Sequence, residues 1–550
     1  MPTTTTYTTP GVYVVEKTAF PPSVVGVKTA VPAFIGYTQK AEVAGQPVEL
    51  VPIKIGSLAD FEEKFGTAYK PIYTITLVDD PTTDTYDFRV MNPTLATPAY
   101  QYYKLTTTDG TFNLYNSMRL FYANGGGECY VVSVGPYATT SGGVTTPTTI
   151  AGSDLTKGLK AIKEQVGPTM LVVPDAVLLP PTPATKDTTP WVSSDFTDVI
   201  QAMLQQCEAL QDRVAILDVY GTQYLTPPAQ HGATQDLIID QFRLDLSNTG
   251  VSDTGLSYGM AYFPFLDTTV VQAAQITYDN LNIADSTATG DGLLQKILTW
   301  QTTDTYPAGD PRIPLIVADI NKIAPANTAS DIKTLNHNLT ASVPLLTQIE
   351  GVVAEKESVL PPSAAMAGVM SYVDTTRGVW NAPANVSLAA VDQPTVAVNA
   401  TQQSGLNVPV DGKAVDALRT FPGRGTVVWG ARTLNGNSPD YRYIQVRRTL
   451  IYIEQSIKNA LNQFVFAPNN GQTWTTVTST VSGFLQTVWS QGGLMGAKAS
   501  DAFTVQCGLG STMTGQDILN GNMIVQVTLQ MIRPAEFIEL TFKQTMEGVS

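Results

Sequence analysis

Both ends of this 550-residue chain have the pattern of apolar β-strands, and this limits what the chain can fold into. Near the start, a β-rich run at 12–16 follows a Thr-rich segment. Near the end, residues 523–531 alternate apolar and polar side chains, and residues 537–543 alternate again. A period of two predicts a half-buried strand. Because chain ends are usually polar and frayed, these strands must pair with their own chain or with a neighbouring one.

The composition narrows the class of partner. Charged residues make up only 14% of the chain, and its net charge of −15 argues against nucleic acid as a primary partner. The charge is uneven, because residues 411–550 hold 11 Lys+Arg and 9 Asp+Glu, a balance of +2, whereas the remainder has a balance of −17. The C-terminal part is therefore predicted to face an acidic partner.

The cysteines and the apolar segments indicate the compartment. Three scattered cysteines without CxxC spacing predict neither a disulfide framework nor a zinc site, and they suit assembly in a reducing cytoplasm. The start lacks the basic and apolar regions of a signal peptide. Because no run of about 18 apolar residues occurs, no direct membrane insertion is expected.

The middle of the chain alternates apolar runs with amphipathic helices. Strands are expected at 33–37, 129–134, 170–173, 214–217 and 258–265. Helices are expected at 155–166, 196–210, 235–246 and 363–372, with two long ones at 443–464 and 477–489. This order predicts an α/β layer with a largely parallel sheet. The expected fold class is thus α/β (mixed α+β) and multidomain, with β-rich residues 70–112 and helical residues 267–355 as two insertions.

Residues that could carry catalysis are few. His231 and His337 lie in polar stretches and are interpreted as solvated loop residues. Asp175 and Asp218 follow two predicted strands, where the ligands of α/β enzymes bind. An enzyme could use them as a carboxylate pair, but bonding to loop backbone is the favoured interpretation. No catalytic residue, no metal ligand and no cofactor is expected.

The helix at 443–464 carries a second signal. Arg447, Arg448 and Lys458 occupy its less apolar side. Spacing alone favours a solvated helix face. The positive charge balance of the C-terminal part favours a basic ridge that docks an acidic partner.

Eight segments occur in a fixed order along the chain: TPGVYVVE at 9–16, VPAFIGY at 31–37, RGVWNAPAN at 377–385, WGARTL at 429–434, YRYIQVRR at 441–448, IEQSI at 453–457, LMGA at 494–497 and PAEFI at 534–538. Together they resemble the contractile tail sheath family, which includes the sheaths of myophages, R-type pyocins and extracellular contractile injection systems. The resemblance covers roughly the first 65 and the last 190 residues, and the set as a whole is specific although no single segment is.

The resemblance implies that terminal arms add strands to sheets of neighbouring subunits. The donor segments would be 12–16 and one or both of 524–531 and 537–542, and the receiving sheet would lie within 411–550. The implied strand-exchange residues are Val12, Tyr13, Val14, Val15, Ile524, Val525, Val527, Leu529, Phe537, Ile538, Leu540 and Phe542. An inner-tube contact is assigned to Arg447, Arg448 and Lys458, with the uncharged helix at 475–490 as the competitor.

The resemblance also implies a domain plan. Its parts are an N-terminal arm at 1–22, a first part of the core at 23–69 and 113–138, insertions at 70–112 and 267–355, an α/β sheath domain at 150–266 and 356–410, a tube-facing domain at 411–520 and C-terminal arm strands at 521–550.

The implied function is that of a homo-oligomeric helical sheath, built of stacked six-fold rings, that contracts by rigid-body subunit rotation and drives an inner tube through a cell envelope. Baseplate and terminal cap proteins are the other implied partners. The particle would be assembled in a bacterial cytoplasm, and its release from the cell is left open as an alternative. An extracellular injection system is favoured, a myophage or pyocin sheath is the alternative, and a non-contractile tube or shell protein is an alternative of another class.

Overall fold

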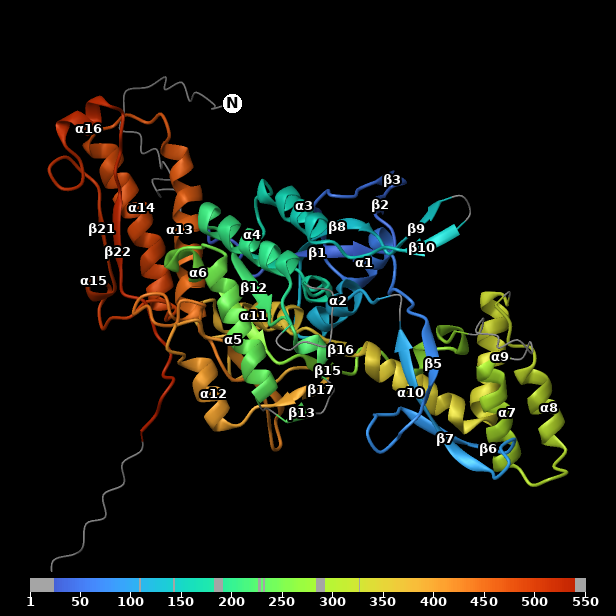
Figure 1. Cartoon of the computed structure of the whole chain (residues 1–550). Helices are drawn as coiled ribbons and strands as arrows, with labels where there is room; N and C mark the ends of the chain where they lie inside the picture. Colours follow the sequence, from blue (N-terminus) through green and yellow to red (C-terminus); the bar gives the residue numbers. More distant parts are fainter. Residues whose placement is uncertain are drawn as a thin grey trace, which may run out of the picture. The chain divides into compact units, whose positions relative to one another are not determined.

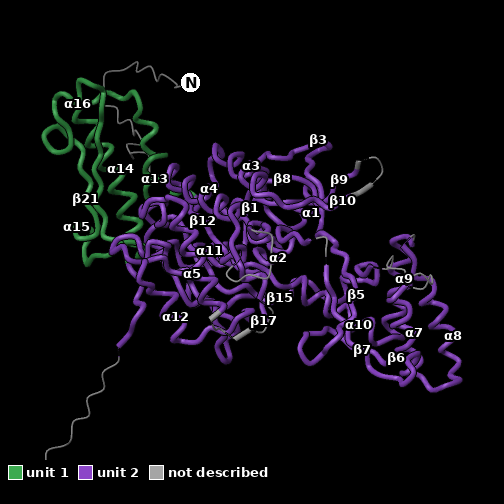
Figure 2. The backbone as a smooth tube through the Cα atoms, in the orientation of Figure 1, with its two compact units in different colours: residues 1–27, 452–532 green, residues 28–451, 533–550 purple. Residues whose placement is uncertain are grey.

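The structure, a computed structural model, describes residues 24–107, 110–141, 144–182, 191–225, 229–230, 233–282, 292–325 and 327–539. The predicted donor strand at 12–16, Leu540, Phe542 and His231 lie outside the described residues. The chain divides into two compact units (Figure 2). Unit 1 comprises residues 1–27 and 452–532, and unit 2 comprises residues 28–451 and 533–550.

Unit 2 is built on an eight-stranded sheet in which six neighbouring strands, from β8 to β19, are parallel and the two edge strands are antiparallel. In spatial order the strands are β20 (Gly425–Val428), β19 (Asp416–Phe421), β14 (Gly259–Phe263), β12 (Val214–Asp218), β11 (Met170–Val172), β1 (Pro32–Thr38), β8 (Cys129–Pro136) and β4 (Ile53–Ile55). Every residue of β1, β11, β12 and β14 is buried, as in a sheet covered on both faces. The predicted largely parallel α/β layer is confirmed.

Two groups of helices cover this sheet (Figure 1). α2 (Leu114–Ala123) and α11 (Ser363–Arg377) pack on each other and on β1, β11 and β12, whereas α3 (Gly152–Lys163) and α4 (Ser194–Leu210) pack together and on β1, β8 and β12. α5 (Ala233–Asn248) packs beside α4. The small residues of α11 allow a close approach to α2, since a Cβ on Gly368 would stand 2.6 Å from the carbonyl oxygen of Phe121.

Two buried carboxylates lie at the carboxyl ends of parallel strands: Asp175 follows β11, and Asp218 ends β12. Asp175 accepts hydrogen bonds from the backbone N–H groups of Tyr37 (2.9 Å) and Asn113 (2.7 Å). Asp218 accepts from the backbone N–H (2.8 Å) of Ser363, the first residue of α11, and lies 2.6 Å from its hydroxyl. Burial raises the pKa of Asp175 to about 6 and that of Asp218 to about 7. Each carboxylate bonds loop or helix backbone, as the favoured interpretation predicted.

The two predicted insertions share a single hydrophobic core. One contributes a three-stranded sheet of β5 (Tyr73–Val78), β7 (Ala99–Thr107) and β6 (Phe88–Asn92), and the other contributes α7 (Leu293–Thr305), α8 (Arg312–Ile320), α9 (Ala329–Ser342) and α10 (Pro344–Glu357). The Tyr73 hydroxyl donates to Glu357 at 2.5 Å across this junction. The sequence predicted both segments, but it did not predict that they bury each other's apolar faces.

Shorter elements complete unit 2. They are β2 (Glu42–Val43), β3 (Gln46–Pro47), α1 (Leu58–Phe65), β9 (Ala138–Ser141), β10 (Val144–Pro147), η1 (Ala176–Leu178), η2 (Thr222–Tyr224), β13 (Ala229–Gln230), α6 (Asp253–Leu256), β15 (Leu266–Thr268), η3 (Ala273–Gln275), η4 (Tyr278–Asn280), β16 (Val359–Leu360), β17 (Val391–Pro394), β18 (Val396–Ala397) and α12 (Ala400–Asn407).

Unit 1 contains the end of the long helix α13 and the elements that follow it. α13 (Ile444–Leu461) begins in unit 2 and continues into unit 1. After it come η5 (Asn462–Phe464), α14 (Gly471–Ser490), α15 (Ala499–Ala502), β21 (Phe503–Gln506), α16 (Gly515–Leu519) and β22 (Gln526–Leu529). The predicted C-terminal domain began at residue 411, which is too early, because β19 and β20 extend the large sheet and residues 411–451 belong to unit 2.

Candidate functional site

A small two-stranded sheet in unit 1 has the features expected of an assembly site. β21 and β22 pair antiparallel, with Phe503 opposite Leu529 and Val505 opposite Val527. These four side chains are half-buried, whereas the alternating Thr and Gln side chains on the other face are exposed. α14 packs on β21 and buries its own Val477, Val481 and Leu485. The helix therefore supports a short strand pair that has one covered and one open face.

The hydrogen-bond register defines which backbone groups of this sheet remain open. Gln530 N donates to Ala502 O at 2.8 Å, which makes this directly opposed pair a hydrogen-bonded one. Because the two kinds of pair alternate along an antiparallel ladder, the N–H and C=O groups of the 503–529 and 505–527 pairs point away from the ladder. Within the described residues, no further strand joins either edge.

These edges lack the devices that usually protect exposed strands. Neither β21 nor β22 contains a charged residue or a proline, although edge strands are normally blunted by lysine, proline or bulges. The whole of 452–532 contains only five charged side chains, namely Glu454, Lys458, Lys498, Asp501 and Asp517. Charge depletion is typical of the centres of protein interfaces. Unit 1 thus presents two unprotected edges on a nearly uncharged body.

This arrangement corrects one part of the predicted strand exchange. Segment 524–531 contains β22, which pairs with β21 of its own chain and so is not a free arm. Phe537 and Ile538 lie in no strand of the described structure, and their side chains are 77% and 78% exposed. Of the two alternative C-terminal donor segments, 537–542 is the one whose described residues are available.

The predicted basic ridge is also corrected, because Arg447 is buried. Its guanidinium lies between the rings of Tyr258 and Tyr441, 4.2 and 3.9 Å from their centroids, and it donates to the Ser257 hydroxyl at 2.5 Å. Only 3% of Arg447 is exposed. Cation–π stacking and desolvation of this kind stabilise packing inside the subunit.

Arg448 is equally inaccessible. It forms a bidentate ion pair with Asp374, at 2.6 and 2.9 Å, in which both side chains are less than 5% exposed. The same guanidinium donates to the carbonyl oxygen of Thr29 at 3.1 Å. Arg448 therefore binds the segment that leads from the N-terminal arm into the body. Of the three predicted tube-contact residues, Lys458 is exposed.

A third buried arginine holds Glu536, close to the end of the chain. Arg432 donates to both carboxylate oxygens of Glu536, at 3.0 and 2.6 Å, and Asn407 and the Tyr443 hydroxyl donate to the same carboxylate at 2.6 and 3.1 Å. Burial alone would raise the pKa of Glu536, but the bonds and the charge of Arg432 outweigh it and lower the pKa. We call these four residues the arm clamp.

The sequence contained a signal for the arm clamp, although no role was assigned to it. Arg432 and Glu536 fall in two of the segments that carry the family resemblance, but they are 104 residues apart and only the fold brings them together.

Other residues considered from the sequence do not form a site. His337 is exposed on α9. Among the described residues, no three His, Cys, Asp or Glu side chains are grouped as metal ligands would be. Within the same ranges, no helix has both the length and the hydrophobicity to cross a bilayer.

Comparisons with known proteins agree with this description. A family model described as the phage tail sheath C-terminal domain matches residues 437–545. The tail sheath protein of Burkholderia phage BcepMu is 28% identical over 148 residues, which are 26% of this chain and 31% of that relative's length.

Two solved structures match nearly the whole chain. The sheath complex of an extracellular contractile injection system, PVC, in its contracted state has a TM-score of 0.55 and 25% identity, covering 98% of this chain and 99% of that one. The helical sheath of the anti-feeding prophage in its contracted state has a TM-score of 0.54 and 24% identity, covering 98% and 100%. At this identity the second match shows the fold alone.

The burial of Arg448 leads to a testable prediction about stability. Arg448→Met leaves the Asp374 carboxylate buried without its partner, so we expect the free energy of unfolding to fall by about 3–5 kcal/mol in urea titrations. Lys458→Met, on the exposed side of the same helix, should stay within about 0.5 kcal/mol of the parent. Equal stability of the two variants would contradict the buried role of Arg448.

The arm clamp generates a second prediction. Glu536→Gln keeps the shape of the side chain but removes its charge, so Arg432 holds it less strongly. We expect backbone amides of 533–539 to exchange hydrogen for deuterium at least severalfold faster, as measured by mass spectrometry. Glu539→Gln, three residues further along and exposed, is the matched control and should leave the exchange unchanged. Equal exchange in both variants would show that the clamp does not hold the segment.

Proposed function

We propose that this chain belongs to the phage tail sheath family and is the repeating subunit of a contractile sheath that polymerises around an inner tube. The observation that carries the proposal is the β21–β22 sheet, whose two uncharged edges are joined by no other strand in the part of the chain that the structure describes. The match over nearly the full length to the sheath of a contractile injection system supports the same conclusion.

In this proposal each sheet receives strands from other subunits. An extended segment that joins an edge satisfies the outward-facing N–H and C=O groups of Phe503 and Val505, or those of Val527 and Leu529. The donors are the N-terminal segment Val12–Val15 of one neighbour and the C-terminal segment Phe537–Phe542 of another. Because donor and receiver are different surfaces, the interface is heterologous, and repetition of a heterologous contact builds a helical filament.

Thr29 and Glu536, the residues at which the two arms begin, are bound by buried arginines. This suits a contraction in which subunits move as rigid bodies. Arg448 and Arg432 fix the two ends of the body from which the arms leave, so displacement between subunits falls on the arm segments beyond Thr29 and Glu536. Filament continuity can then survive a large rotation of each subunit, as in other rigid-body switches. The inner tube would be driven forward as the sheath shortens.

The surface proposed to face the inner tube is the exposed side of α14 together with Lys458. Ser479, Gly483 and Gln486 lie on this side of α14, which bears no charge. Three of the arginines behind the predicted positive balance, Arg432, Arg447 and Arg448, are buried. We therefore expect the tube contact to depend little on salt, unlike contacts made by exposed charge pairs.

The wider machine is part of the proposal. The assembly would be a phage-tail-like particle built in a bacterial cytoplasm, with stacked six-fold rings, a baseplate and a terminal cap as further partners. An extracellular contractile injection system is favoured by the match to the PVC sheath complex. The curated relative is a phage tail sheath protein, which keeps a phage tail as the second candidate.

The open edges provide the test of this function. Val505→Pro removes an N–H that points away from the ladder, and proline is tolerated at such a position of an edge strand. We expect a folded, soluble subunit that no longer forms filaments by negative-stain electron microscopy, because the receiving edge lacks a donor group. Val527→Pro tests the other edge in the same way.

Thr504→Pro is the matched control, because it removes an N–H that faces the ladder and should instead destabilise unit 1 itself. Filaments of normal length and number from the Val505→Pro and Val527→Pro variants would refute strand addition at these edges.

A further inference from the structure

A surface groove lies beside the arm clamp. It has a volume of about 510 Å³ and is lined by α5 on one side and by residues 405–411 on the other. Its apolar wall includes Leu244 and Val408, each 52% exposed, and Val410, which is fully exposed. Three large apolar side chains thus stand together in solvent, where an apolar segment of chain could cover them.

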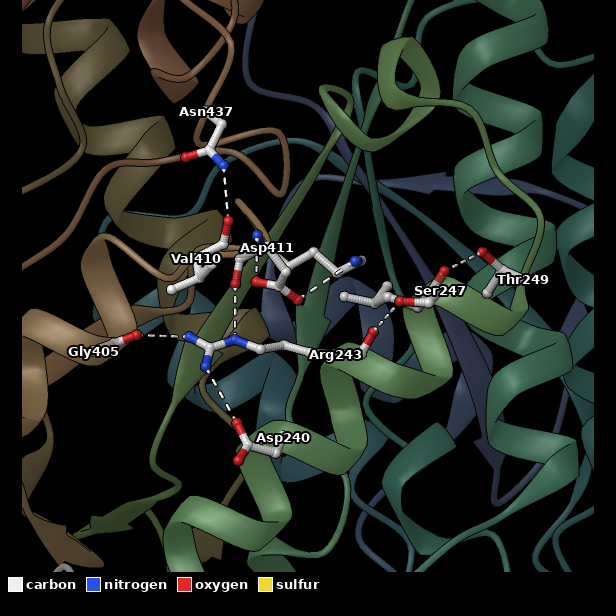
Figure 3. Close-up of polar contacts among 10 residues, drawn as sticks. Asp240, Arg243, Ser247, Thr249, Gly405, Val410, Asp411 and Asn437 are labelled. Atoms are coloured by element: carbon white, nitrogen blue, oxygen red, sulfur yellow. Dashed lines mark hydrogen bonds and ion pairs between the residues drawn. The ribbon is translucent and has the colours of Figure 1, made fainter.

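Polar contacts behind the groove hold its wall in place (Figure 3). Arg243 on α5 donates to Gly405 O at 2.8 Å and to Lys413 O at 3.1 Å. Asn437 Nδ2 donates to Val410 O at 3.3 Å. The backbone on both sides of Val408 and Val410 is thus fixed before any ligand binds, which lowers the ordering cost of binding.

The arm clamp holds Glu536, from which the C-terminal tail continues, next to the residues of the groove wall. Asn407, which donates to Glu536 at 2.6 Å, immediately precedes Val408 of the groove wall. An extended chain advances by at most about 3.6 Å per residue, so Leu540 can lie up to about 14 Å from Glu536. The tail that follows the described residues therefore starts within reach of the groove.

The chemistry of the tail matches that of the groove. In an extended conformation Ile538, Leu540 and Phe542 project from one face and can cover an apolar wall.

We propose that, in the free subunit, this groove binds the chain's own C-terminal tail through Leu540 and Phe542. The inference rests on the proposed role of 537–542 as a donor strand and adds a regulation to it, because a tail held in the groove is not available to a neighbour. A short tether gives the tail a millimolar effective concentration, which favours the subunit's own groove over that of a second subunit at micromolar concentration.

The test uses the full-length free subunit with the photo-reactive analogue p-benzoylphenylalanine in place of Phe542. Illumination at micromolar subunit concentration should cross-link position 542 to α5 or to residues 405–413 of the same chain, as identified by mass spectrometry. Dilution should leave the yield unchanged. Val410→Glu places a charge on the apolar wall and should reduce the yield about tenfold.

Leu315→Glu is the matched control, since Leu315 is also an exposed apolar residue (69%) but lies on α8, a helix that packs into the other hydrophobic core of unit 2 through Ile316 and Ile320. It should leave the yield unchanged. Cross-links outside the groove, or a yield that Val410→Glu does not reduce, would overturn the proposal. Cross-links that form only between subunits and vanish on dilution would also overturn it.

These outcomes are independent of the proposed sheath function, because the measurement is made on subunits that have not polymerised. Loss of filaments in the edge variants and loss of cross-links in the Val410→Glu variant can each occur without the other.

Discussion

The outward-facing backbone of the β21–β22 sheet is the constraint on which this structure depends. A two-stranded sheet is only marginally stable by itself, and here α14 packs on β21 while no other strand of the described residues joins either edge. The N–H and C=O groups of Val505 and Val527 point outward on strands that carry no charge. Such edges are a hazard to a monomeric protein but an advantage to a subunit that polymerises, and this difference connects the small unit 1 to the proposed function.

Two buried arginines of unit 2 bind residues near the two ends of the chain. Arg448 binds Asp374 and the Thr29 carbonyl near the N-terminal arm, and Arg432 binds Glu536 at the base of the C-terminal arm. Buried ion pairs of this kind contribute little net stability compared with apolar packing, but they define geometry sharply. Their effect here is to fix the positions of Thr29 and Glu536, from which the chain continues toward its two ends.

Most of the fold could be predicted because its signals are local. The strands β1, β8, β11, β12 and β14 are continuous apolar runs, and the helices between them have clear apolar faces. The alternation at 523–531 likewise predicted a strand correctly. Its partner could not be predicted, because β21 has only four residues and its alternation is too short to stand out from the surrounding loops.

The errors concern long-range contacts that a helical pattern does not contain. The spacing of Arg447 and Arg448 showed that they share a side of α13, but not that Tyr258, Tyr441 and Asp374 cover that side. The pairing of the two insertions into one core was missed for the same reason, since each has an apolar face whose partner is about 200 residues away in the chain.

The most direct measurement of the central claim is a cryo-electron microscopy reconstruction of the assembled particle, at a resolution that traces the main chain through unit 1. The account predicts that the β21–β22 sheet of every subunit gains one strand from the N-terminal segment of one neighbour and one from the C-terminal segment of another. A reconstruction in which both edges of that sheet stay open, or are filled by segments of the same chain, would contradict it.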